Sequence, residues 1–141
     1  MKIKIFAFIT LLICCLTLHA QGVSYNQEFQ VNTYTYGDQM NPNVSYLLNG
    51  GFVVCWHDWV PDSSVGNIYG QLFNGNGSKH GTEFQVNTYT KDDQALACVS
   101  AISNDKFIVC WQSYGQDGNH QGIFGQIFYN DGLKYLIFTH K

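Results

Sequence analysis

Short runs of apolar and aromatic residues, each broken by turn residues, follow one another along most of this chain. The runs are rich in β-branched and aromatic side chains and are too short for helices, so they predict β-strands. Asn-Gly and Asp-Gly pairs lie between several of them, and such pairs supply the positive φ angles that tight hairpins require. The predicted strands are 43–48, 52–58, 67–73 and 82–88 in the first half of the chain, and 98–102, 107–113, 122–129 and 135–139 in the second.

The two halves are copies of one repeat. The octapeptide Glu-Phe-Gln-Val-Asn-Thr-Tyr-Thr occurs at 28–35 and again, letter for letter, at 83–90, an offset of 55 residues. A period of this order is typical of solenoids, propellers and arrays, in which each unit buries its apolar faces against its neighbours. We therefore predict one β repeat domain, 21–141, with a first unit at 28–82 and a second unit, whose end diverges, at 83–141.

The predicted fold class is all-β, with two four-stranded antiparallel meanders of the kind that form propeller blades. The second strand of each unit is apolar at consecutive positions, from Phe52 to Trp56 and from Phe107 to Trp111, as expected for a strand that is buried on both faces. A β-sandwich, the alternative, predicts a cleaner alternation, because one face of each sheet meets water.

A leading strand at 28–33 precedes the first unit and has the sequence of a unit's last strand. Closed propellers typically carry four to eight blades, and two blades cannot close a ring. The chain therefore predicts an incomplete propeller. Either several copies assemble as a homo-oligomer that completes the ring, or the chain is a fragment of a larger propeller protein.

Residues 1–20 have the pattern of a secretory signal peptide. Lys2 and Lys4 precede an apolar run from Ile5 to Leu18, and the small residue Ala20 follows. The run is shorter than the roughly 20 residues that a membrane-spanning helix needs. We expect a secreted, extracellular protein with no membrane span in its mature chain.

The charge of the chain disfavours several classes of partner. All seven residues counted as Lys or Arg are lysines, and loss of Lys2 and Lys4 with the signal peptide changes the net charge from −3 to −5. Nucleic-acid binding needs a basic surface, and bidentate recognition of phosphate or carboxylate typically uses Arg. We therefore expect no nucleic-acid partner, and a sialidase, which binds its substrate carboxylate with arginines, is disfavoured for the same reason.

Three cysteines remain after the signal peptide. Cys98 and Cys110 would lie directly opposite each other in a hairpin with a three-residue loop, so one prediction is a disulfide between them. We prefer a second prediction, in which the repeat-equivalent Cys55 and Cys110 are small buried apolar residues of their strands.

Two sequons are N-glycosylation candidates if the chain enters a eukaryotic secretory pathway. They are Asn43-Val44-Ser45 and Asn76-Gly77-Ser78. Asn76 is the better candidate, because it lies in an Asn-Gly turn whereas Asn43 starts a predicted strand.

Four motifs along 28–132 carry a resemblance to a known group of repeats. They are Gly-Gly-Phe-Val-Val-x-Trp, Trp-Gln-Ser-Tyr-Gly-Gln-Asp-Gly, Ile-Phe-Gly-Gln-Ile-Phe and Glu-Phe-Gln-Val-Asn-Thr. Together they resemble the tandem β-propeller-type repeats of large secreted adhesin-like and hemolysin-type calcium-binding proteins. The resemblance implies propeller-like modules with an extracellular binding or display role, and it implies no catalytic residues.

Polar residues in the loop after the second strand of each unit, and at the flanks of that loop, are the candidates for metal binding. They are His57, Asp58 and Asp62 in the first unit and Asp117, Asn119 and His120 in the second. Calcium takes six to eight oxygen ligands, usually from acidic residues at short spacing, and only Asp117 and Asn119 approach that pattern. We prefer a hydrated turn there and expect no cofactor, with calcium as the alternative. Zinc is disfavoured, because no Cys or His cluster has ligand spacing.

The chain carries no recognisable catalytic motif, so we expect no enzyme. A nucleophile elbow, Gly-x-Ser-x-Gly, does not occur in it. A glycosidase needs two carboxylates about 5 to 9.5 Å apart, and Asp58 with Asp62 or Asp117 is the pairing available. A secreted glycoside hydrolase, or a fragment of one with no independent function, is the alternative hypothesis.

Aromatic residues at the start of the long loops are the candidates for ligand binding. Trp59 and Tyr114 occupy equivalent places in the two units, near Asp62 and Asp117 respectively. Aromatic rings stack on sugar rings, and neighbouring carboxylates and amides can bind the hydroxyl groups. We predict a non-enzymatic recognition or surface-display module whose ligand is a carbohydrate or an extracellular protein.

Overall fold

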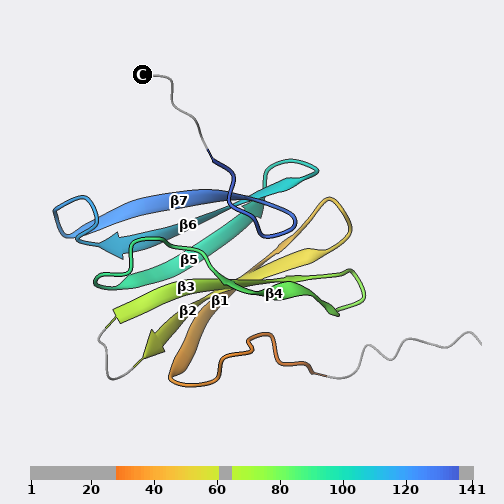
Figure 1. Ribbon diagram of the computed structural model, residues 1–141, viewed down its shortest axis with the longest axis horizontal. Coiled ribbons are helices and arrows are strands. Elements are labelled where there is room, and N and C mark those ends of the chain that lie inside the picture. Colours follow the sequence, from red (N-terminus) through yellow and green to blue (C-terminus); the bar gives the residue numbers. More distant parts are fainter. Residues whose placement is uncertain (1–27, 61–64, 137–141) are drawn as a thin grey trace, which may run out of the picture.

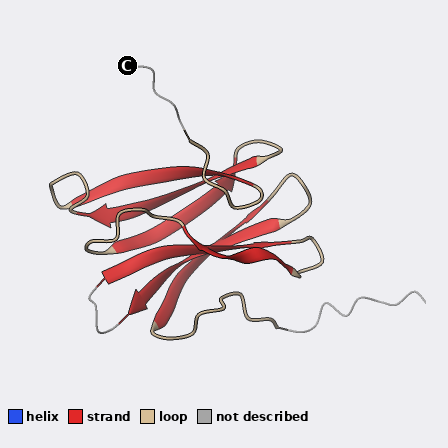
Figure 2. Cartoon of the chain, viewed as in Figure 1, coloured by secondary structure: helices blue, strands red, loops and turns tan. Residues whose placement is uncertain are grey.

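A computed structural model describes residues 28–60 and 65–136, and the structural statements below concern these residues. The predicted signal peptide and Asp62 lie outside them. The described residues contain no helix, and so none that is long and apolar enough to cross a membrane (Figure 2).

Seven antiparallel strands form two sheets, which confirms the all-β prediction. The first sheet consists, in spatial order, of β1 (Asp38–Tyr46), β2 (Phe52–Val60), β3 (Val65–Phe73) and β4 (Lys79–Gln85). The second sheet consists of β5 (Gln94–Ala101), β6 (Lys106–Tyr114) and β7 (Gln121–Tyr129). Figure 1 shows the two sheets stacked on each other, with β5 beside the first sheet.

Each of these seven strands lies where the sequence predicts one, with ends that differ by a few residues. The predicted hairpin chemistry is also confirmed at the turns. Gly50, Gly77 and Gly132, each preceded by Asn or Asp, have φ angles of +91°, +84° and +87°. These glycines therefore supply the left-handed conformation that the turns require.

The prediction of a leading strand at 28–33 is wrong, because these residues form no strand. The segment lies instead on the face of the first sheet that points away from the second sheet (Figure 1). Its apolar side chains determine this position. The Phe29 and Phe73 rings are 5.5 Å apart, and Val31 packs with Val54 and Trp56.

The predicted last strand, 135–139, is present only at its beginning. Lys134 forms an isolated bridge with Phe128, and the backbone N–H of Tyr135 donates to the carbonyl of Ile127. Residues 137–139 lie outside the described residues. Within the described part of the chain, the second meander therefore has three strands rather than the predicted four.

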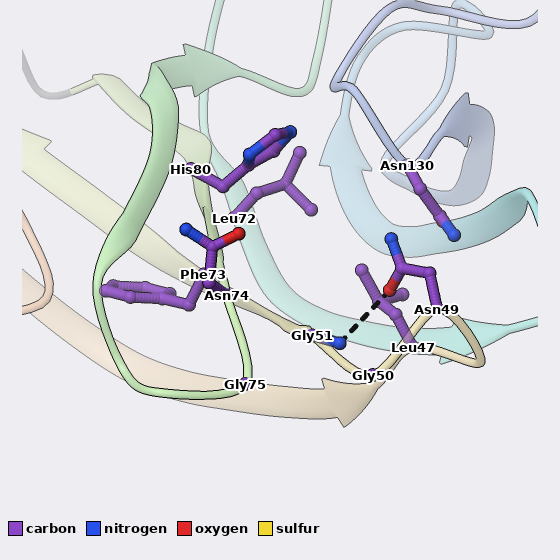
Figure 3. A pocket seen from close by; sticks show the side chains of 10 residues that line it. All are labelled: Leu47, Asn49, Gly50, Gly51, Leu72, Phe73, Asn74, Gly75, His80 and Asn130. Atoms are coloured by element: carbon purple, nitrogen blue, oxygen red, sulfur yellow. Dashed lines mark hydrogen bonds between the residues drawn. The ribbon is translucent and has the colours of Figure 1, made fainter.

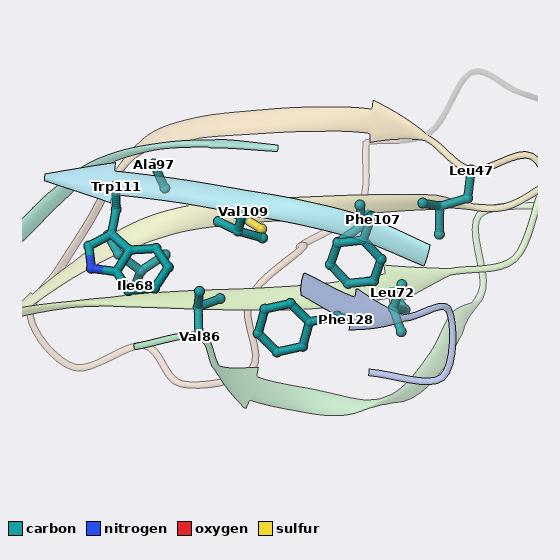
Figure 4. Packing of buried hydrophobic residues seen from close by; sticks show 11 residues of the cluster. Leu47, Ile68, Leu72, Val86, Ala97, Phe107, Val109, Trp111 and Phe128 are labelled. Carbon is teal, nitrogen blue, oxygen red and sulfur yellow. The ribbon is translucent and has the colours of Figure 1, made fainter. Parts of the chain in front are cut away.

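The main core lies between the two sheets and takes side chains from both (Figure 4). The Phe107 and Phe128 rings are stacked with centroids 5.3 Å apart, and Phe84 of β4 lies 5.4 Å from Phe128. The other core members are Leu47, Val53, Cys55, Ile68, Leu72, Val86, Ala97, Val109 and Trp111. A smaller cluster on the opposite face of the first sheet contains Val54, Trp56 and Phe73.

The two octapeptide copies pack in the same way, each on the sheet that follows it in sequence. Phe84 meets Phe128 at 5.4 Å and 48°, and the equivalent pair, Phe29 and Phe73, meets at 5.5 Å and 55°. Only the second copy also pairs as a strand, since its first three residues end β4. The repeat in the sequence is therefore also a repeat in the packing.

Candidate functional site

Trp59 lies in a cleft at the seam between the two sheets. It is near the end of β2, directly opposite Asp38 of β1, and opposed residues of antiparallel strands project from the same face. Asp93, which immediately precedes β5, closes the cleft from the second sheet. The cleft measures about 340 Å³ and is lined by Asp38, Met40, His57, Trp59 and Asp93; we call it the seam cleft.

The floor of the seam cleft is a buried histidine facing a carboxylate. His57 is 6% exposed, and its Nε2 atom lies 3.3 Å from Oδ1 of Asp93, within ion-pair range. Neither atom makes a hydrogen bond within the described residues. A Cβ atom at Gly66 would collide with both side chains, so only glycine at this position allows the approach. Because buried polar groups are usually satisfied, this pair is suited to a ligand hydroxyl or a water molecule.

Tyr114, the second predicted aromatic, lies beside the same acidic residue. Its backbone N–H donates to the carbonyl of Asp93 at 2.9 Å, and its half-exposed ring contacts His120 edge-on at a centroid distance of 6.2 Å. Asp93 and Asp38 are repeat-equivalent, as are Tyr114 and Trp59. The structure thus brings two aromatic–carboxylate pairs to the same end of the molecule.

Asp117 and Asn119 lie in the β6–β7 turn, where their side chains accept hydrogen bonds from the backbone. Oδ1 of Asp117 accepts from the backbone N–H of Asn119 at 3.1 Å, and Oδ1 of Asn119 accepts from that of His120 at 2.9 Å. Across residues 28–60 and 65–136, no group of three or more His, Cys, Asp or Glu side chains converges as a metal site.

Asp58 is separated from Trp59 by the sheet itself. Successive strand residues point to opposite faces, and Asp58 is buried on the side away from the seam cleft. Its Oδ1 accepts from Nε2 of Gln39 at 2.8 Å. Of the predicted glycosidase pairings, the one with Asp62 lies outside the described residues, and Asp117 is held in the β6–β7 turn.

Of the two cysteines predicted to be buried, Cys55 is buried and Cys110 is half-buried. Cys98 and Cys110 are directly opposed in the β5–β6 hairpin, and both are free thiols in the structure. Burial, together with the nearby Cys98, raises the pKa of the half-buried Cys110. Cys55 is fully buried between the sheets, and this burial, with a smaller effect of Cys98, raises its pKa to about 12.

The two sequons differ in accessibility. Asn76 is exposed in the β3–β4 turn, where its Oδ1 accepts from the backbone N–H of Ser78 at 3.0 Å. Oδ1 of Asn43 accepts from the backbone N–H of Val99 at 3.0 Å and so links the two sheets. A glycan at Asn76 would project into solvent, whereas one at Asn43 would have to fit beside this contact.

A second cavity lies among the hairpin turns at the far end of the strands (Figure 3). It is lined by the side chains of Asn49, Asn74, His80 and Asn130, with Leu47 and Leu72 beneath them. Its volume is about 120 Å³. Since a water molecule takes about 30 Å³ of liquid volume, this cavity is suited to a few waters rather than to a sugar ring.

The sequence alone pointed to Trp59 and Tyr114 but missed Asp38 and Asp93. His57 was considered only as a metal ligand. The missed signal was the dipeptide Asp-Gln, which recurs at the repeat offset as Asp38-Gln39 and Asp93-Gln94. Outside the octapeptide, such an exact recurrence of an acidic residue marks a position worth testing for function.

No protein-family model, curated protein or solved structure matches this chain.

Proposed function

We propose that this protein is a secreted, non-enzymatic recognition module that binds carbohydrate in the seam cleft. The observation that carries the proposal is the pairing of Trp59 with Asp38 beside the buried His57 and the half-exposed Asp93. An indole face covers the apolar side of a sugar ring, and carboxylates accept hydrogen bonds from its hydroxyl groups. His57 supplies a further polar atom at the floor of the cleft.

The size of the cleft agrees with a small ligand. A volume of about 340 Å³ lies at the lower end of the range of roughly 300 to 1,000 Å³ that small-molecule sites occupy. The cleft is a shallow surface feature with one aromatic ring, so affinity for a single sugar will be low. We expect dissociation constants on the order of 1 mM, or about −4 kcal/mol.

We place the two meanders as propeller-type blades in an extracellular display protein. Three observations support this placement. The first sheet has four antiparallel strands in sequential order, the second sheet packs on it face to face, and the leader has the pattern of a signal peptide. The resemblance to repeats of secreted adhesin-like proteins agrees with the same role.

Substitution of Trp59 tests this function. The wild-type chain is first screened on an array of neutral and acidic oligosaccharides, and the best glycan is then titrated by NMR or calorimetry. We expect Trp59→Ala to weaken binding at least tenfold and Trp59→Phe to restore part of it. Tyr114→Ala is the matched control, because Tyr114 is the equivalent residue outside the seam cleft and should leave binding within twofold.

Two results would reject the proposal. One is the absence of glycan binding by the folded wild-type chain at millimolar sugar. The other is binding that Trp59→Ala leaves unchanged.

A further inference from the structure

The interface between the two sheets serves as a template for a second interface of the same kind. Within the chain, the first sheet contributes Leu47, Val53, Ile68 and Leu72 to this interface. The second sheet contributes Phe107, Val109, Trp111 and Phe128. The two sheets are repeats of each other. The far face of each sheet therefore carries residues equivalent to those that the other sheet contributes to the internal interface.

The far face of the second sheet carries the counterparts of the first sheet's buried residues, but it is uncovered. Ile123 is 73% exposed, whereas the equivalent Ile68 is 0% exposed. Ile102 is 49% exposed, whereas Leu47 is 1% exposed. Large apolar side chains gathered on one exposed face indicate an interaction surface.

The far face of the first sheet carries the complementary residues. Val54, Trp56 and Phe73 are the counterparts of Val109, Trp111 and Phe128, which β4 and the rest of the first sheet cover. Here Phe52, Tyr69 and the leading segment, residues 28–33, pack against them, and a groove of about 330 Å³ remains beside Trp56. Each end of the two-sheet stack thus presents one half of the interface that the chain makes internally.

The leading segment shares one local hydrogen bond with the second copy of the octapeptide. Nδ2 of Asn32 donates to the carbonyl of Tyr34 at 2.7 Å, as Nδ2 of Asn87 does to that of Tyr89 at 2.8 Å. In the second copy, Oδ1 of Asn87 also accepts from the backbone N–H of Ile68, and the N–H of Val86 donates to the carbonyl of Ile68. The equivalent partner for Asn32 and Val31 is Ile123 on the outer strand, β7.

The edge of β7 has the residues that strand pairing with residues 28–33 requires. In the first sheet, Phe84 of β4 lies directly opposite Gly70, and its ring fills the space where a Cβ atom would be. The equivalent of Gly70 is Gly125, which is exposed. Phe29, the equivalent of Phe84, is 55% exposed, so both members of the matching pair are available.

The residues that follow β7 differ in sequence from the corresponding residues of the first unit. Lys134 and Tyr135 start along β7 in the register of Lys79 and His80. By the repeat offset in the sequence, Thr139 and Lys141 correspond to Phe84 and Val86. The octapeptide at 28–35 keeps both apolar residues.

We propose that the second sheet docks onto the first sheet of another copy of this chain, and that residues 28–33 of that copy pair with β7 as a fourth strand. The new contact repeats the internal one, with Phe29 opposite Gly125 and Asn32 beside Ile123. It is a heterologous, head-to-tail contact, which generates a ring when the rotation closes. The proposal does not depend on carbohydrate binding.

Solution mass tests the docking, with two substitutions chosen from the repeat. We expect the exported full chain to be oligomeric by light scattering over a dilution series, and Ile123→Lys to reduce it to a folded monomer. Leu133→Lys is the matched control, because Leu133 is similarly exposed but its equivalent, Ser78, is exposed too. Circular dichroism on each peak verifies that the strands remain.

A folded wild-type chain that stays monomeric overturns the proposal and leaves the two faces to a partner of another kind. An oligomer of the same mass in both variants overturns it as well.

Cross-linking tests the register. In a background with Cys98→Ser and Cys110→Ser, one chain with Phe29→Cys and another with Gly125→Cys are mixed and oxidised. We expect a disulfide-linked dimer from this mixture and at least fivefold less from a mixture of Phe29→Cys with Leu133→Cys. Equal yields in the two mixtures would contradict the proposed pairing.

Discussion

Two repeat-equivalent residues, Asn41 and Leu96, have the same strained backbone conformation. Asn41 and Leu96 both have a φ of +52°, at the points where the registers of β1 with β2 and of β5 with β6 shift. Asn adopts left-handed backbone angles readily, whereas a branched residue such as Leu does so at a cost of about 1 to 2 kcal/mol. The bulge is therefore retained in the second unit even with an unsuitable residue.

Exchanging these residues should change stability in opposite directions. Leu96 is mostly exposed, so Leu96→Asn loses little packing and should raise the free energy of unfolding by about 1 kcal/mol. Asn41→Leu should lower it by a similar amount. Urea unfolding monitored by tryptophan fluorescence measures both, and a midpoint that does not rise in Leu96→Asn would show that the bulge carries no strain.

At the scale of the element, the two octapeptides demonstrate that context decides between strand and loop. The first three of these eight residues end β4 in one copy, whereas the same residues form no strand in the other. In β4 the edge of β3 is available for pairing, and Asn87 then terminates the strand by bonding Ile68, Asn67 and Tyr89. Asn32 bonds the carbonyl of Tyr34 and the side chain of Gln39 in β1, but no backbone N–H of a neighbouring strand donates to its side chain within the described residues.

Truncation of the two asparagines should separate these roles. Asn87 is 3% exposed, and Asn87→Ala leaves the buried N–H of Ile68 unsatisfied, so we expect a loss of about 2 kcal/mol. Asn32→Ala should cost less than about 1 kcal/mol, because its bonds lie nearer to solvent. Thermal unfolding of both variants gives the comparison, and equal losses would mean that the capping of β4 by Asn87 contributes little.

Much of the element order follows from the sequence, whereas the missed features depend on contacts between distant segments. Asn-Gly and Asp-Gly pairs marked the turns, and apolar runs marked the strands between them. The prediction of a leading strand at 28–33 is wrong, because a strand needs the free edge of a neighbouring strand to pair with. The sequence of one segment does not show whether such an edge lies beside it. Trp59 could be identified by its place before a loop, but its approach to Asp93 results from the stacking of the sheets.

At the scale of the whole molecule, the pKa of Cys55 depends on the packing of the two sheets against each other. Cys55 is fully buried between the two sheets, beside Gly70 of β3. Its thiol has a pKa of about 12, compared with 9.0 for an exposed thiol. Separation of the sheets would therefore favour ionisation of this thiol, because it removes the burial that raises the pKa.

This shift predicts a loss of stability in alkali. The folded pKa is raised, so the thiol's contribution is fully present below pH 9 and is lost as pH rises from about 9 to 12, because the unfolded chain releases the proton first. The free energy of unfolding should fall by up to roughly 1.4 kcal/mol per pH unit in this range. Cys55→Ala should lack this part of the decline, and identical profiles for both chains would contradict the assignment to Cys55.

The two ends of the two-sheet stack carry complementary faces, and this complementarity affects how a gene of this kind can be lengthened by duplication. A unit that presents a shape on one side and its complement on the other can be copied in frame without evolving a new contact, since each added junction reuses residues already selected at the old one. A point change that precedes a duplication is inherited by both copies, so it acts at more than one junction of the same molecule. Length then becomes an easily varied property, and selection can adjust the reach of the protein by counting units instead of redesigning them.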